Sequence, residues 1–169
     1  MSDAEVEAVI GAALDAGFRH FDTAQIYGNE AALGRALKSA GAKREDLFLT
    51  TKVWVDKYAK GPFAASVDES LDKLGVDQVD LLLLHWPADK VPVAEQVALI
   101  NEVQAAGRTR FIGVSNQNAP QLRESVAVSP APIVTNQIEL NPYIDNAKVV
   151  AAAKELGVVA IHCNHQQLT

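Results

Sequence analysis

"FRHFDTAQIYGNE" (residues 18–30) begins as a short hydrophobic strand and then places polar residues just past it. Asp22 stands at the end of this strand, and Tyr27 follows it in the loop. An acid and a phenol placed together where a strand ends raise the question whether a functional site lies there.

The same order of strand and then helix repeats along the rest of the chain. Short runs rich in β-branched residues alternate with amphipathic stretches, and a glycine follows four of these stretches, as helix C-caps do. We expect strands at 18–24, 47–53, 78–86, 109–115, 133–140 and 158–163. We expect helices at 3–16, 30–40, 63–74, 93–106, 117–127 and 146–156.

This alternation predicts an α/β fold with a parallel sheet, which is either an open doubly wound sheet or a barrel. The glycine fingerprint GxGxxG of an open dinucleotide fold is absent from the sequence. A barrel instead takes site residues from the carboxyl ends of many strands. Polar residues stand at that end of five strands, which favours the (β/α)8 barrel class: Asp22, Lys52, His85, Ser115 with Asn116, and Gln137.

Composition restricts the class of protein further. With 169 residues, 49% hydrophobic and 21% charged, the chain is expected to form a single globular domain over 1–169. The longest apolar run, VDLLLLHW, is too short to cross a bilayer. A net charge of -6 argues against nucleic-acid or anionic-membrane partners, so a small-molecule substrate is expected. The acidic amino terminus and the single cysteine, Cys163, predict a cytoplasmic protein.

Four of the polar residues have a joint chemical interpretation. A free phenol is a weak acid at neutral pH, but a nearby ammonium favours its anionic form. Lys52 would supply that charge to Tyr27, and the carboxylate of Asp22 would keep the lysine charged. His85 could donate a hydrogen bond that orients a carbonyl oxygen. These roles suit carbonyl reduction with an external hydride donor, and they need no metal.

The remaining polar residues suit a nicotinamide. Ser115, Asn116 and Gln137 offer a hydroxyl and two side-chain amides, which are the donors and acceptors that a carboxamide requires.

Five motifs in register resemble the aldo-keto reductases, and most closely the bacterial branch similar to 2,5-diketo-gluconate reductases. They are GFRHFDTAQIYGNE, LFLTTKVW, VDLLLLHWP, RFIGVSN and NQIELNP. The resemblance covers residues 4–161 and implies NADPH-dependent reduction of aldehydes or ketones on an eight-stranded barrel. It implies catalytic roles for Asp22, Tyr27, Lys52 and His85, with Tyr27 as the proton donor. It further implies cofactor contacts from Thr23, Ser115, Asn116 and Gln137, and pocket walls formed by Trp54 and Trp86.

The chain departs from this family at both ends. The family's first hairpin and strand do not precede residue 3, and the family's terminal phosphate-binding segment does not follow residue 169. Asn164 stands where the family has an aromatic residue that stacks on the nicotinamide. We therefore expect a chain truncated at both ends and an incomplete barrel of about six strands. The full family barrel is expected to be a monomer, whereas the open edges here would permit self-association.

Alternative interpretations depend on the same residues. The chain could be an inactive or regulatory relative of the family, or a metal-dependent hydrolase using Asp22, His85 and His162. A smaller metal cluster could involve His162, Cys163 and His165. Structural roles are also open: Asp22 could cap a turn, Ser115 or Asn116 could cap the following helix, and Trp54, Trp86 and His85 could belong to the core.

Overall fold

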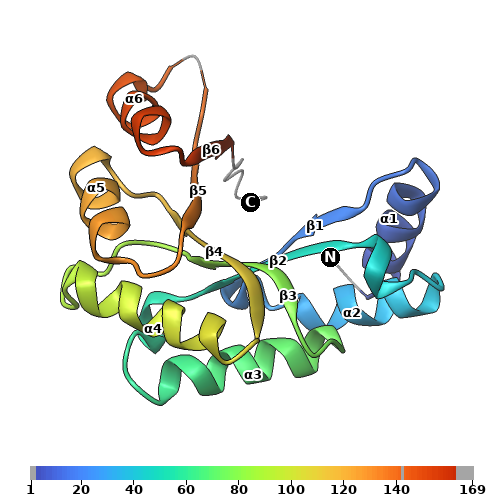
Figure 1. Ribbon diagram of the computed structural model, residues 1–169. Coiled ribbons are helices and arrows are strands. Elements are labelled where there is room, and N and C mark those ends of the chain that lie inside the picture. The colour runs from blue at the N-terminus through green and yellow to red at the C-terminus, as the bar shows by residue number, and fades with distance from the viewer. Residues whose placement is uncertain (1–2, 142, 163–169) are drawn as a thin grey trace.

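Six parallel strands form one sheet in the computed structural model of the protein, which describes residues 3–141 and 143–162. Each strand pairs with its neighbours along the sequence, so the order in the sheet is β1-β2-β3-β4-β5-β6. The sheet curls into a half-barrel with the helices on its outer side (Figure 1). The predicted parallel fold of about six strands is thus confirmed. The strands are β1 (His20–Asp22), β2 (Phe48–Val53), β3 (Val79–Leu84), β4 (Thr109–Ser115), β5 (Ile133–Ile138) and β6 (Val159–His162).

Six α-helices and three short 3-10 helices occur in the described residues. The α-helices are α1 (Asp3–Asp15), α2 (Glu30–Ser39), α3 (Pro62–Leu74), α4 (Val93–Ala105), α5 (Ala119–Val128) and α6 (Ala147–Leu156). The 3-10 helices are η1 (Gln25–Tyr27), η2 (Arg44–Asp46) and η3 (Val55–Lys57). None of the described helices is long and apolar enough to span a membrane. The single domain expected over 1–169 stays a prediction.

Every predicted helix and strand with described residues is present, although several ends differ. The first strand is predicted over 18–24 but spans only His20–Asp22, because its register with β2 runs from His20 opposite Phe48 to Asp22 opposite Thr50. The third strand is predicted over 78–86 and ends at Leu84, which leaves His85 and Trp86 in the loop. Cys163, Asn164 and His165 lie outside the described residues.

The start of α5 corrects one alternative interpretation. The helix is capped by Asn118, whose side chain accepts a hydrogen bond from the Gln121 backbone N–H at 3.0 Å. The Gln121 side chain accepts one in return from the Asn118 N–H. This reciprocal arrangement is a capping box. The prediction that Ser115 or Asn116 caps the helix is therefore wrong: Ser115 ends β4, and Asn116 lies in the turn before the helix.

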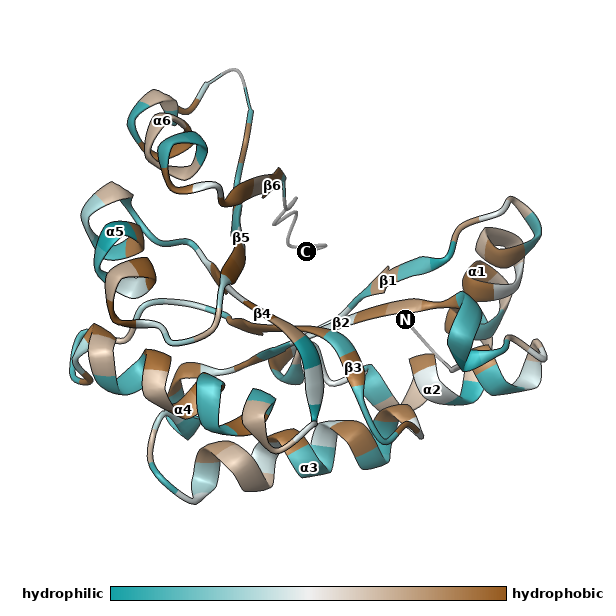
Figure 2. Ribbon diagram, in the orientation of Figure 1, coloured by the Kyte–Doolittle hydropathy of each residue, from teal (hydrophilic) through white to brown (hydrophobic). Residues whose placement is uncertain are grey.

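The main hydrophobic core lies between the sheet and the helices. Leu82 and Leu84 of β3 and Val53 of β2 pack there against Phe63 and Val67 of α3, and all five are at most 1% exposed. Hydrophobic and hydrophilic residues alternate along α3 and α4 in Figure 2, as expected for helices that bury one face. Side chains on one face of the strands pack against the helices, so residues on the opposite face are available to form the site.

A glycine allows close packing on that opposite face. Gly113 of β4 is the register partner of Leu83, which is in turn the register partner of Lys52. A Cβ atom at Gly113 would lie 2.8 Å from Leu83 Cδ2 and 2.8 Å from Thr135 Cγ2. The curled sheet therefore has no space for a side chain at this position.

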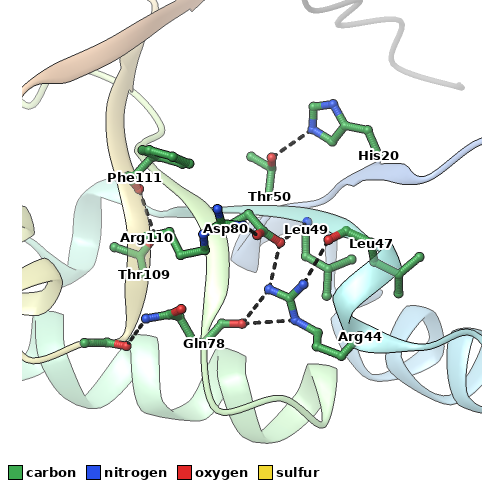
Figure 3. A network of polar contacts seen from close by, with 11 residues as sticks. His20, Arg44, Leu47, Leu49, Thr50, Gln78, Asp80, Thr109, Arg110 and Phe111 are labelled. Atoms are coloured by element: carbon green, nitrogen blue, oxygen red, sulfur yellow. Dashed lines mark hydrogen bonds and ion pairs between the residues drawn. The ribbon is translucent and has the colours of Figure 1, made fainter.

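The amino ends of the central strands are tied by a buried carboxylate (Figure 3). Asp80 of β3, whose side chain is 1% exposed, accepts a hydrogen bond from the Leu49 N–H at 2.8 Å. It forms ion pairs with Arg44 and Arg110, each at 2.7 Å. Burial alone would raise the pKa of Asp80, but these donors together hold it below its usual range. This network stabilises the end of the sheet opposite the candidate site.

Candidate active site

The predicted site residues occupy the carboxyl ends of successive strands. Asp22 ends β1, Lys52 is the penultimate residue of β2, and His85 directly follows β3. Ser115 ends β4, and Gln137 is the penultimate residue of β5. Because parallel strands carry these ends at one rim of the sheet, residues far apart in the sequence meet there.

Lys52 and Asp22 form an ion pair at this rim. Lys52 is 1% exposed, and its ammonium contacts Asp22 Oδ1. The same ammonium donates to the Thr23 carbonyl oxygen at 3.1 Å. A buried ammonium is costly without such partners, so the pair explains why a lysine is tolerated inside the curled sheet. Asp22 therefore does more than cap a turn.

Tyr27 lies above this pair on the short helix η1. Its side chain is 46% exposed, and Lys52 Nζ lies 5.0 Å from the centre of its ring. The ring of His85 meets Tyr27 edge to face, with centroids 5.6 Å apart and an interplanar angle of 88°. Tyr27 is thus in contact with both the charged pair and the histidine, as the sequence predicts.

His85 is 1% exposed and sits between two aromatic rings. Besides Tyr27 it contacts Trp54, with ring centroids 5.1 Å apart. Trp54 is partly buried, whereas Trp86 is 41% exposed at the rim. The two tryptophans therefore differ: Trp54 contacts the His85 ring, and Trp86 is the more exposed of the two.

The other two tyrosines have different surroundings. Tyr58 is buried and its hydroxyl donates to the Trp86 carbonyl oxygen at 3.1 Å. Burial raises the pKa of Tyr58 above its usual range, so its phenol stays protonated. Tyr143 is 96% exposed on a surface loop. Tyr27 is therefore the tyrosine that the structure brings to the Lys52 ammonium.

A second polar cluster, formed by Ser115, Asn116 and Gln137, occupies the ends of β4 and β5. The Ser115 hydroxyl donates to the Gln137 carbonyl oxygen at 2.8 Å. Asn116 Nδ2 donates to Ser115 Oγ at 3.0 Å and to the His85 carbonyl oxygen at 3.1 Å. Asn116 has a φ of 58°, the only positive value for a non-glycine among the described residues. Such strain is often retained at functional sites.

Gln137 joins the two halves of the site. Its side chain is well buried, and Nε2 donates to Asp22 Oδ2 at 2.8 Å. Its Oε1 has no hydrogen-bond partner among residues 3–141 and 143–162. A buried acceptor without a partner is costly, and an N–H donor from a ligand would satisfy it. The carboxamide of a nicotinamide has such a donor, so these residues fit that group.

The sequence did not predict the contacts of two further residues near the site, Thr23 and Gln25. Thr23 is buried and its hydroxyl donates to Asn29 Oδ1 at 2.6 Å, so this oxygen already has a protein partner. Gln25 carries no predicted role, yet its side chain links η1 to β2 and α3. Its position inside the FRHFDTAQIYGNE stretch was the only available signal, because the contacts join distant segments.

His162, which the metal hypothesis requires, forms a hydrogen bond with the backbone just beyond β5. His162 ends β6, and its Nδ1 accepts a hydrogen bond from the Leu140 N–H at 2.9 Å. Within the described ranges no group of three or more His, Cys, Asp or Glu side chains is placed to hold a metal ion.

The model of the aldo/keto reductase family matches residues 1–165 of the chain. The chain belongs to the aldo/keto reductase family. This confirms the resemblance inferred from the five motifs, and it covers all of the site residues described above.

Curated members of the family share substantial identity with the chain. Methylglyoxal reductase DkgB of Escherichia coli O157:H7 is 45% identical over 161 residues, which are 94% of this chain and 60% of that protein. An aldo-keto reductase of Mycolicibacterium vanbaalenii is 41% identical over 160 residues, with 94% and 57% covered. The chain thus spans about 60% of the length of these family members.

Solved structures of the family share the curled sheet. A protein provisionally assigned as a 2,5-diketo-D-gluconic acid reductase B is 55% identical, with a TM-score of 0.93 over 96% of this chain and 58% of that one. The Bombyx mori aldo-keto reductase in complex with NADP is 36% identical, with a TM-score of 0.88 over 96% and 57%. The predicted resemblance to the 2,5-diketo-gluconate reductase branch is therefore confirmed.

Proposed function

We propose that the protein reduces aldehydes or ketones to alcohols with NADPH, with Tyr27 as the proton donor. The observation that carries this proposal is the position of the Tyr27 ring beside the buried Lys52 ammonium and the His85 ring. Membership of the aldo/keto reductase family and the similarity to a methylglyoxal reductase support it.

The ion pair of Lys52 and Asp22 assists proton transfer from Tyr27 in this proposal. As the phenol loses its proton to the alkoxide, negative charge develops on its oxygen, and the Lys52 ammonium stabilises that charge. Asp22 offsets part of the cost of burying the ammonium by direct contact. Lys52 itself is 1% exposed, so its interactions are stronger than they would be in water.

His85 and the tryptophans position the carbonyl group. The His85 ring lies edge-on to Tyr27, so a carbonyl oxygen that reaches the phenol also lies near the imidazole. Trp54 also contacts the His85 ring, at nearly a right angle, and would help to hold its orientation. We expect Trp54 and Trp86 to form apolar walls around the substrate.

The cofactor contacts follow from the second polar cluster. A bound nicotinamide nucleotide would supply the hydride for the reduction. Gln137 Oε1, which lacks a partner among the described residues, would accept from the carboxamide N–H. Ser115 and Asn116 supply the neighbouring hydroxyl and amide, and Thr23 lies beside the Lys52 ammonium. We name NADPH as the cofactor because similar solved structures are complexes with NADP or NADPH.

The substrate class is a small dicarbonyl compound. The similar proteins are named for methylglyoxal and for 2,5-diketo-D-gluconic acid, each of which has two carbonyl groups. A small-molecule partner also agrees with the net charge of -6.

Turnover of NADPH with methylglyoxal, followed by cofactor absorbance, tests the proposal directly. We expect Tyr27→Phe to abolish turnover and leave NADPH binding within about twofold, because the phenol is needed for proton transfer and not for binding. Tyr143→Phe is the matched control, since Tyr143 is 96% exposed. NADPH binding without turnover by the unaltered chain would instead identify an inactive family member.

A further inference from the structure

The turn that carries Tyr27 lacks the packing that usually fixes a catalytic side chain. None of the residues of η1, all of them within the described part of the chain, is buried. Ile26 is 52% exposed and Tyr27 46% exposed. Because apolar burial is the main term that orders a segment, another interaction must hold this turn in place.

The two ends of the turn are held by Thr23. Its backbone N–H donates to the Thr50 carbonyl oxygen at 2.9 Å, which extends the pairing of β1 with β2. Its hydroxyl donates to Asn29 Oδ1 at 2.6 Å and so brings the far end of the turn back to the near end. These bonds close the loop, but they do not fix its middle against the rest of the protein.

Gln25 fixes the middle. Its Oε1 accepts a hydrogen bond from the backbone N–H of Trp54, at 3.0 Å, just beyond the end of β2. Its Nε2 donates toward α3, to the Ser66 carbonyl oxygen and Ser66 Oγ, each at 3.1 Å, and to Ser70 Oγ at 3.2 Å. One amide thus joins η1 to both a strand end and a helix.

The two serines can only accept from Gln25. Each hydroxyl has one proton, and Ser66 donates its proton to the Phe63 carbonyl oxygen at 2.8 Å. Ser70 donates its proton to the Ser66 carbonyl oxygen at 3.1 Å. On the α3 side, the two serines therefore present only lone pairs to position 25, so the side chain there must donate toward α3. Toward the Trp54 N–H it must accept. A carboxylate of the same shape could not satisfy both sides.

We propose that Gln25 is a positioning residue that holds Tyr27 over the Lys52 ammonium and beside His85. This inference rests on the proposed function, since it assigns the side chain that sets the geometry of the proton donor. Gln25 itself does not contact the reacting groups. Its loss allows η1 to move, and a displacement of about 1 Å at a catalytic group can lower the rate about 100-fold.

Two substitutions separate the two sides of the amide. Gln25→Glu retains an acceptor for the Trp54 N–H and places oxygen against the serine lone pairs, whereas Gln25→Met removes both sides at similar volume. We expect kcat to fall about 10- to 100-fold in both variants, with the dissociation constant of NADPH changed less than about twofold. Protection of the Trp54 amide against hydrogen exchange should be lost in Gln25→Met and largely retained in Gln25→Glu.

The matched control is Gln78→Met. Gln78 is also a loop-bridging glutamine, with Nε2 donating to the Gly107 carbonyl oxygen at 2.6 Å, but it lies at the opposite end of the strands. This variant should retain kcat, NADPH affinity and Trp54 protection. A purely structural role for Gln25 would lower thermal stability without the selective loss of kcat.

Ring contacts measured by NMR test the inference independently of turnover. Nuclear Overhauser effects between the rings of Tyr27 and His85 should weaken in both Gln25 variants and persist in Gln78→Met. If these effects and kcat are unchanged in Gln25→Met, or if NADPH affinity falls as much as kcat, the inference is wrong. If the unaltered chain shows no turnover, the proposed function fails, and the ring contacts alone still decide whether Gln25 positions Tyr27.

Discussion

The side chain of Gln137 spans the curled sheet to Asp22, with Nε2 donating to Oδ2 at 2.8 Å. Asp22 thus has both carboxylate oxygens engaged, one by Lys52 and one by Gln137. The contact connects β5 to β1, which are not neighbours in the sheet. Gln137, the proposed contact of the carboxamide, is therefore linked through Asp22 to Lys52, which lies beside the proposed proton donor Tyr27.

Replacing Gln137 should weaken nucleotide binding. We expect Gln137→Met to lower NADPH affinity about tenfold, because the Oε1 acceptor for the carboxamide is lost. Fluorescence titration of the nucleotide measures the change. Gln104→Met is the control, since the Gln104 amide bonds the Arg110 carbonyl oxygen at an exposed position. Equal affinity in Gln137→Met and the unaltered protein would contradict the assigned contact.

Replacing Asp22 should lower the free energy of unfolding more than replacing Lys52, its partner in the ion pair. Asp22→Asn leaves the Lys52 ammonium buried without a carboxylate, so we expect a loss of about 2 kcal/mol in the free energy of unfolding. Lys52→Met removes the buried charge and should cost less, while still abolishing carbonyl reduction. The double variant should recover part of the stability lost in Asp22→Asn. Urea denaturation of the three variants measures these differences, and an additive double variant would contradict the coupling.

The close packing around Gly113 on the inner face of the sheet predicts a third result. Gly113→Ala should destabilise the fold by about 1–3 kcal/mol, because its Cβ would lie 2.8 Å from atoms of both Leu83 and Thr135. Gly11→Ala is the matched control: nothing lies within 4 Å of a Cβ there, and the residue is inside α1. Alanine should stabilise that helix by about 0.5–1 kcal/mol. Thermal denaturation distinguishes the opposite signs.

The buried carboxylate at the other end of the sheet predicts a pH dependence. Asp80→Asn should lower the free energy of unfolding by about 1–3 kcal/mol at pH 7, because charged hydrogen bonds to Arg44 and Arg110 are lost. The pKa of Asp80 is lowered in the folded state, so this stabilisation is complete above the unfolded pKa of about 3.9 and disappears as pH falls through the folded value.

The difference between the unaltered protein and Asp80→Asn should therefore be constant from pH 7 to about 5 and shrink below about pH 4. Denaturation curves recorded across that range measure it. Arg110→Met gives a comparison, because the Arg110 side chain is 55% exposed and its loss should cost less. A difference that grows at acid pH would show that another group controls the effect.

Periodicity and glycine positions predicted the order and type of the described α-helices and strands, but not the three 3-10 helices. The ends of strands were less predictable, because they depend on pairing: Phe18 lies in the predicted first strand but is 63% exposed, and pairing with β2 begins at His20. Likewise, the start of α5 depends on the reciprocal bonds of Asn118 and Gln121, and the sequence offers several polar residues that could cap it.

The candidate site was predictable where residues lie at strand ends. The Lys52–Asp22 pair and the approach of Tyr27 and His85 follow from that placement. The roles of Gln25 and Asp80 were not predictable, because each depends on side chains from segments that only the folded chain brings together. An isolated polar residue in a sequence does not reveal its distant partners.

The sheet order has a consequence for how the protein is made. Because each strand pairs with the one before it, the growing chain can add β2 to β1, and then each later strand in turn, as it leaves the ribosome. Loop closure at each step involves only one helix and its turns, so the entropic cost of each pairing step rises only slowly with the length of the crossover. The Gln137–Asp22 bond is formed late in this order, 115 residues after Asp22 is synthesised. Completion of the site would therefore report that the first five strands have assembled in sequence.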